Sequence, residues 1–166
     1  MQVVPMSAPL GATVQDLDVR SVDAKLWPTL NDLFNKHHVL VFPNQDLTPA
    51  DHMAFAQHWG ELVPFPYGGI EGYPNIIELR NNGKKRDVNQ HWHSDMTYDP
   101  MPPKLTMLYA LEAPALGGET AFSNQILAYQ ELSDGLRDVV DDLVALHSAE
   151  DLARLSGADP AEASRA

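Results

Sequence analysis

Apolar residues recur every three or four positions in two stretches of the chain, which is the spacing of an amphipathic helix. The first stretch covers residues 22–37 and carries Val22, Leu26 and Leu30 on one side. The second covers residues 126–143 near the other end of the chain. We expect helices in both, although Pro28 fits only a first helical turn and leaves the start of the first helix open.

Residues 48–60 combine an apolar face with signals for both helix ends. Thr48 suits the N-cap, Pro49 the first helical position, and Asp51 the acidic third position of a capping box. The apolar face continues to Gly60, a residue that commonly ends helices. The sequence therefore predicts a third helix here.

Short β-rich runs separated by Gly and Pro make up much of the remainder. Small apolar and polar residues alternate around a glycine in residues 1–20, and residues 39–42 form a compact apolar run that predicts a buried strand. Residues 76–80 and 104–113 are further strand candidates. Because strands and helices do not alternate regularly, a doubly wound parallel sheet is not favoured.

Composition narrows the classes of function. The 166 residues carry a formal net charge of −12 and contain no cysteine. An acidic chain binds phosphate backbones and anionic membranes poorly, and the missing thiols exclude disulfides and thiolate metal sites. The N-terminus lacks a basic start and a long apolar run, so we expect a cytoplasmic protein without a secretory signal.

The segment WHSD, residues 92–95, holds the strongest candidate chemistry. In an extended segment His93 and Asp95 point to the same side, because side chains alternate along the backbone. They could then supply two of the three ligands of a 2-His-1-carboxylate triad, which leaves three positions open on non-haem iron. A tripeptide of this kind is weak evidence by itself, because a His-Asp pair is often only a surface hydrogen bond.

Two other histidines could in principle complete such a site. His91 precedes His93 by two residues, but three alternating ligands on one strand span roughly 13 Å, too far for one ion. His147 follows the helical stretch at 126–143 and could be the third ligand of a different cupin-like enzyme.

The surroundings of the pair resemble the TauD/TfdA-like family of Fe(II)- and 2-oxoglutarate-dependent dioxygenases. The family pattern W-H-x-D-x-[ST]-[FY] matches residues 92–98, and its P-P and G-G-[DE]-T patterns match residues 102–103 and 117–120. Upstream, HHVLVFPNQDLTP and HWGEL are also similar to this family. The resemblance covers nearly all of residues 7–148.

This resemblance implies roles for individual residues. His93 and Asp95 match the proximal Fe(II) ligands, and Thr120 matches the hydroxyl that holds the distal carboxylate of the 2-oxoglutarate cosubstrate. Asn89 matches a position that contacts the primary substrate. Phe65 and Tyr67 fall in a loop that usually lines the substrate pocket. The implied partners are a small organic molecule and O₂, with hydroxylation as the reaction.

The implied fold is mixed α/β and mainly β, a double-stranded β-helix or jelly roll with peripheral helices. Residues 1–166 are then expected to be the N-terminal part of a single domain, because the family's distal His and its 2-oxoglutarate-binding Arg follow much later than this chain extends. The full-length protein is expected to form homo-oligomers, and the segment alone to be inactive.

The sequence does not identify the primary substrate. The loop VPFPYGG has no His of the kind that contacts a sulfonate in the taurine-using branch, so taurine is a doubtful substrate. Small sulfonates, sulfate esters, aryloxyalkanoates and amino acids remain candidate classes. The alternative to an enzyme is a catalytically incomplete fragment or interaction remnant of the same fold.

Overall fold

The computed structural model describes residues 1–64, 69–80 and 92–148. The chain divides into two compact units. The first unit comprises residues 1–61 and 108–143, and the second comprises residues 62–107 and 144–166.

A three-stranded sheet with the order β1-β2-β3 is the centre of the first unit. Strand β1 (Gln2–Pro5) runs antiparallel to β2 (Ala12–Gln15), with Val3 opposite Val14. Strand β3 (Leu40–Val41) joins the other edge of β2 in parallel. A parallel pair needs a crossover connection, and helix α1 (Trp27–His37) provides it.

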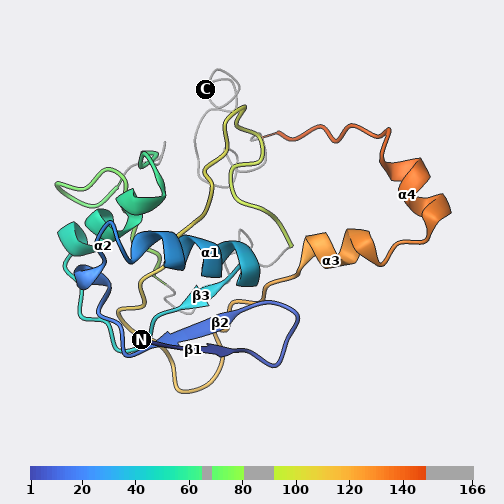
Figure 1. Cartoon of the computed structure of the whole chain (residues 1–166). Helices are drawn as coiled ribbons and strands as arrows, with labels where there is room; N and C mark the ends of the chain where they lie inside the picture. The colour runs from blue at the N-terminus through green and yellow to red at the C-terminus, as the bar shows by residue number, and fades with distance from the viewer. Residues whose placement is uncertain (65–68, 81–91, 149–166) are drawn as a thin grey trace. The chain divides into compact units, whose positions relative to one another are not determined.

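Helix α1 packs against this sheet (Figure 1). Leu30 of the helix and Ala12 and Val14 of β2 have no exposed surface, so the apolar stripe and the inward side of the strand meet as expected. His38 ends the helix in a left-handed conformation with φ 63°, and its N–H donates to the carbonyl of Phe34. The chain then turns directly into β3.

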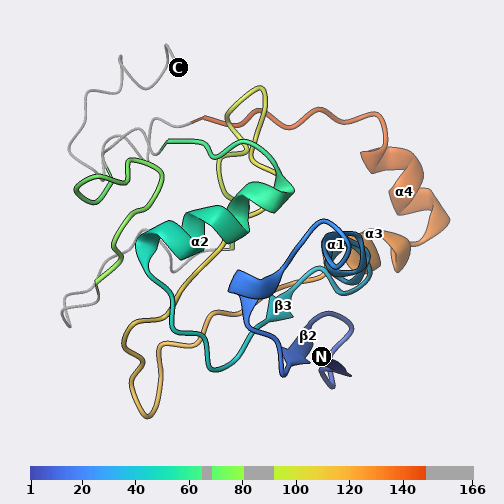
Figure 2. The same cartoon turned by 60° about the vertical axis from the view of Figure 1, so that its left-hand side comes forward.

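Helix α2 (Pro49–Ala56) continues into the short 3-10 helix η2 (Gln57–Trp59), and both lie apart from the sheet in Figure 2. The predicted capping box is present, because the side chains of Thr48 and Asp51 each accept a hydrogen bond from the other's backbone N–H. Phe55 is buried and packs edge-to-face against Trp59 with ring centroids 5.1 Å apart. The helix predicted at residues 48–60 is therefore confirmed.

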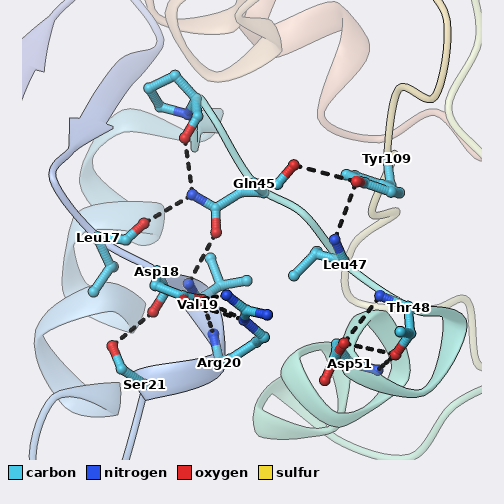
Figure 3. Close-up of polar contacts among 11 residues, drawn as sticks. Leu17, Asp18, Val19, Arg20, Ser21, Gln45, Leu47, Thr48, Asp51 and Tyr109 are labelled. Carbon is cyan, nitrogen blue, oxygen red and sulfur yellow. Dashed lines mark hydrogen bonds and ion pairs between the residues drawn. The ribbon is translucent and has the colours of Figure 1, made fainter.

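Gln45 joins separate segments of the first unit (Figure 3). Its side-chain amide donates to the carbonyls of Leu17 and Pro43, and its side-chain oxygen accepts from the N–H of Val19. That N–H belongs to the 3-10 helix η1 (Val19–Ser21), which packs on α2. One side chain thus satisfies three backbone groups in the loop before α2 and the loop after β2.

The helical stretch predicted at 126–143 consists of two short helices. Helix α3 (Gln125–Gln130) begins at Asn124, and α4 (Asp134–Val140) begins at Ser133; both N-cap side chains accept a backbone N–H. The apolar spacing continues through Ser133, but the helix does not. The Ser133 hydroxyl accepts the N–H of Leu136 and begins a new helix there. Asn124 also donates to the carbonyl of Pro9 at 2.9 Å.

Three strand predictions need correction. The run at 39–42 is a strand only at Leu40–Val41, and Val41 is 41% exposed instead of buried. Neither 76–80 nor 104–113 forms a strand. An apolar run becomes a strand only when another segment pairs with it along the backbone, and no described strand pairs with either of these two runs.

Large apolar side chains remain exposed along the later part of the described chain. They include Leu111, Leu116, Val144 and Leu146, each at least 76% exposed. Among the described residues, in contrast, the buried apolar side chains all belong to the first 55 residues.

No helix among the described residues is long and apolar enough to cross a membrane.

Candidate metal centre

The second unit contains the predicted metal-binding pair. Residues 92–94 have no regular secondary structure, and a turn begins at Asp95, closed by a hydrogen bond from the N–H of Asp99 to the carbonyl of Met96. Met96 takes a left-handed conformation with φ 51°. His93 and Asp95 therefore do not lie on one strand, as side-chain alternation predicted. Their side chains nevertheless point toward each other.

His93 Nε2 lies 3.2 Å from Asp95 Oδ1, and the two side chains are 47% and 51% exposed. Imidazole nitrogens and carboxylate oxygens bind first-row divalent metals at about 2.1 Å, so two ligands at a right angle lie about 3.0 Å apart. The observed separation fits such a pair. In the absence of a metal, the same distance fits an imidazole–carboxylate hydrogen bond.

The second carboxylate oxygen of Asp95 has a partner of its own. Thr106 Oγ1 donates a hydrogen bond to Asp95 Oδ2 at 2.7 Å, across 11 residues of sequence. One oxygen of Asp95 thus faces His93 while the other is held by Thr106. Thr106 could not be identified from the sequence, because this threonine lies outside the motifs and no spacing rule connects it to Asp95.

The other residues predicted to contact the cosubstrate or the substrate do not belong to the described part of the second unit. Thr120 belongs to the first unit and is exposed. It follows Gly117 and Gly118, whose φ angles of 81° and 76° lie in the left-handed region that favours glycine. Asn89, Phe65 and Tyr67 lie outside the described residues, as does His91. The structure brings together His93 and Asp95 of the predicted site.

His147 is exposed in a segment without regular secondary structure. Residues 1–64, 69–80 and 92–148 contain no group of three or more His, Asp or Glu side chains placed to hold a metal ion. Within that part of the chain, His147 does not complete a ligand set with His93 and Asp95. The donor set available there is one nitrogen and one oxygen.

An open groove of about 570 Å³ lies in the first unit, between the loop after β1 and helix α3. Its lining is largely apolar and includes Pro9, Leu10, Phe122 and Leu127. Glu131 is the ionisable side chain in this lining. The groove therefore lacks the convergent polar groups of a catalytic site.

Comparison with known proteins shows the family to which the chain belongs. Residues 2–164 match the family model described as taurine catabolism dioxygenase TauD, TfdA family. The chain therefore belongs to the TauD/TfdA family, as the sequence motifs indicated. The expected fold class is confirmed as well, since the similar solved structures are jelly-roll dioxygenases.

Individual relatives are similar at about one-third identity. A (S)-phenoxypropionate/alpha-ketoglutarate-dioxygenase of Sphingobium herbicidovorans is 32% identical over 152 residues, covering 88% of this chain and 53% of the relative. An alpha-ketoglutarate-dependent sulfate ester dioxygenase of Pseudomonas putida is 33% identical over 175 residues, covering 99% and 56%. The chain thus spans about half the length of the curated relatives it matches.

Two solved structures have the same fold. A taurine dioxygenase from Burkholderia xenovorans superposes with a TM-score of 0.69 at 29% identity, covering 85% of this chain and 51% of that one. The structure of AAD-2 in complex with Mn(II) and N-oxalylglycine gives a TM-score of 0.73 at 26% identity, covering 93% and 56%.

Proposed function

We propose that the complete protein is an Fe(II)- and 2-oxoglutarate-dependent dioxygenase that hydroxylates a small organic substrate. The observation that carries this proposal is the 3.2 Å separation of His93 Nε2 and Asp95 Oδ1, which suits two adjacent ligands of one metal ion. Family membership over residues 2–164 supports the reaction class. Residues 1–166 are proposed to be the N-terminal part of one dioxygenase domain.

Each predicted site residue has a specific task in this proposal. His93 and Asp95 hold the metal on one side through a neutral nitrogen and a carboxylate oxygen. Thr120 donates a hydrogen bond to the distal carboxylate of 2-oxoglutarate. When bound, iron and 2-oxoglutarate supply the activation of O₂, which protein side chains cannot perform.

Substrate recognition is assigned to residues before the metal motif. Asn89 is proposed to contact the primary substrate by hydrogen bonding, while Phe65 and Tyr67 provide apolar walls. The relatives include enzymes named for phenoxypropionate, 2,4-dichlorophenoxyacetate and sulfate esters. We therefore favour an aryloxyalkanoate or sulfate ester, an organic anion with an apolar body.

The test is release of succinate from 2-oxoglutarate by the full-length protein with Fe(II) and a panel of these substrates. His93→Ala and Asp95→Ala should each reduce turnover to the background rate. His147→Ala is the matched control, because this exposed histidine lies outside the proposed ligand pair. Wild-type turnover in either ligand variant would remove the metal assignment, whereas loss of turnover in His147→Ala would favour the cupin-like alternative.

A second candidate is the incomplete remnant of a dioxygenase fold. The observation that favours it is the donor set of two side chains in the described residues, where a facial triad requires three. The reading frame after Ala166 discriminates the two candidates. A downstream His followed by an Arg supports the dioxygenase, and a stop codon supports the remnant.

A further inference from the structure

The two oxygens of the Asp95 carboxylate occupy different environments. Oδ1 lies 3.2 Å from His93 Nε2, and Oδ2 accepts the hydroxyl proton of Thr106 at 2.7 Å. Asp95 and Thr106 belong to the same unit. A hydroxyl that donates to an ionised carboxylate makes a short, charge-assisted hydrogen bond, and 2.7 Å is within the range for such bonds.

A carboxylate with no second partner has little to fix its orientation. The terminal torsion of Asp is broad, and the Asp95 side chain is 51% exposed, so packing alone does not select which oxygen faces His93. The Thr106 hydrogen bond selects one orientation. It also engages one of the two lone pairs of Oδ2, which lowers the tendency of that oxygen to bind the same cation as Oδ1.

We propose that Thr106 is a positioning residue for the metal centre: its hydroxyl holds Asp95 so that a divalent cation binds through Oδ1 alone, beside His93 Nε2. This inference rests on the proposed function, since it presupposes that His93 and Asp95 bind the cation. A one-oxygen contact leaves a further coordination position free for 2-oxoglutarate or O₂. Hydrogen-bond partners of metal ligands commonly change metal affinity or activity by roughly 10–100-fold.

The measurement is Mn(II) affinity of the full-length protein at pH 7.5, from the electron paramagnetic resonance signal of free Mn(II). Thr106→Val removes the hydroxyl while preserving the shape, and Thr106→Ser restores a donor. Asp95→Ala tests the ligand itself. Thr29→Val is the matched control, because Thr29 is an exposed threonine in α1, in the other unit.

We expect Thr106→Val to raise the Kd for Mn(II) roughly tenfold or more, while Thr106→Ser and Thr29→Val stay within twofold of wild type. N-oxalylglycine should also bind more weakly to the Mn(II)-saturated Thr106→Val protein. The metal-free variants should melt at the same temperature as the metal-free wild type, because Thr106 is exposed. A purely structural role of the hydroxyl would instead lower the melting temperature of metal-free Thr106→Val. If Thr106→Val does not fold, Thr106→Ala replaces it.

The outcomes separate the two proposals. If Asp95→Ala loses Mn(II) binding while Thr106→Val binds Mn(II) and N-oxalylglycine like wild type, the role of Thr106 is wrong and the metal centre stands. If Asp95→Ala binds Mn(II) as tightly as wild type, the metal centre itself is wrong. Equal weakening by Thr106→Val and Thr106→Ser would also reject positioning by the hydroxyl.

Discussion

Tyr109 bonds to two backbone groups in the loop before α2, more than sixty positions earlier in the chain. Its hydroxyl donates to the carbonyl of Gln45 at 3.2 Å and accepts from the N–H of Leu47 at 3.1 Å (Figure 3). The three groups are partly buried, so water replaces them poorly. This contact fixes the segment after residue 107 onto the N-terminal part of the first unit.

Replacing Tyr109 with Phe should therefore destabilise the protein. The variant keeps the ring but leaves the Leu47 N–H and the Gln45 carbonyl without this partner, a loss of about 1–2 kcal/mol in the free energy of unfolding. Tyr129→Phe is the matched control, because the Tyr129 hydroxyl donates to Asp141 at an exposed position. Urea denaturation measures both, and equal losses in the two variants would contradict the structural role of Tyr109.

The capping box gives helix α2 a stability that depends on pH. The backbone N–H and hydroxyl of Thr48 donate to the Asp51 carboxylate, and these bonds lower the pKa of Asp51 below its usual 3.8. Because these bonds favour the ionised Asp51 carboxylate in the folded state, that carboxylate stabilises the fold at neutral pH. The stabilisation disappears as the pH falls through about 3.8 toward the lowered pKa of Asp51.

Thr48→Ala should remove the cap at the N-terminus of α2. The expected loss at pH 7 is about 1 kcal/mol in the free energy of unfolding, and the difference from wild type should shrink as the pH approaches the pKa of Asp51. Thr29→Ala, at an exposed position inside α1, should not show this narrowing. Urea denaturation at pH 7, 5 and 3 checks the prediction, which fails if the difference is independent of pH.

His52 should make the fold sensitive to mild acid. It lies on α2 with its ring 6.1 Å from that of Tyr109, and burial lowers the pKa of His52 below 6.5. The unfolded chain then takes up a proton at higher pH than the folded chain. Stability is therefore greatest above about pH 6.5 and declines as the pH falls toward the lowered pKa of His52.

The measurement for His52 is the slope of unfolding free energy between pH 7.5 and 5.5. His52→Gln should flatten the slope, because glutamine does not titrate. His147→Gln, at an exposed position, should retain the wild-type slope. An unchanged slope in His52→Gln would show that burial of this imidazole does not couple protonation to folding.

Thr120 should affect the cosubstrate more than the primary substrate. Thr120→Val in the full-length protein would remove the hydrogen bond proposed between Thr120 and the distal carboxylate, which should raise the KM for 2-oxoglutarate roughly tenfold or more. Thr120→Ser should restore most of the affinity, and Thr29→Val should resemble wild type. Succinate release at varied 2-oxoglutarate checks this, and an unchanged KM in Thr120→Val would separate Thr120 from the cosubstrate.

The sequence alone predicted two helices and the pair of residues that form the candidate metal centre. Helix α1, helix α2 with its capping box, and the His93–Asp95 pair could all be predicted, because helix periodicity, N-cap chemistry and ligand motifs depend on neighbouring residues. The tertiary structure decided which apolar runs became strands, since a strand at 104–113 would need a hydrogen-bonding partner from elsewhere in the chain. It also decided that Thr106 holds Asp95 and that Tyr109 bonds to Gln45 and Leu47, because such contacts join residues whose separation follows no periodic rule.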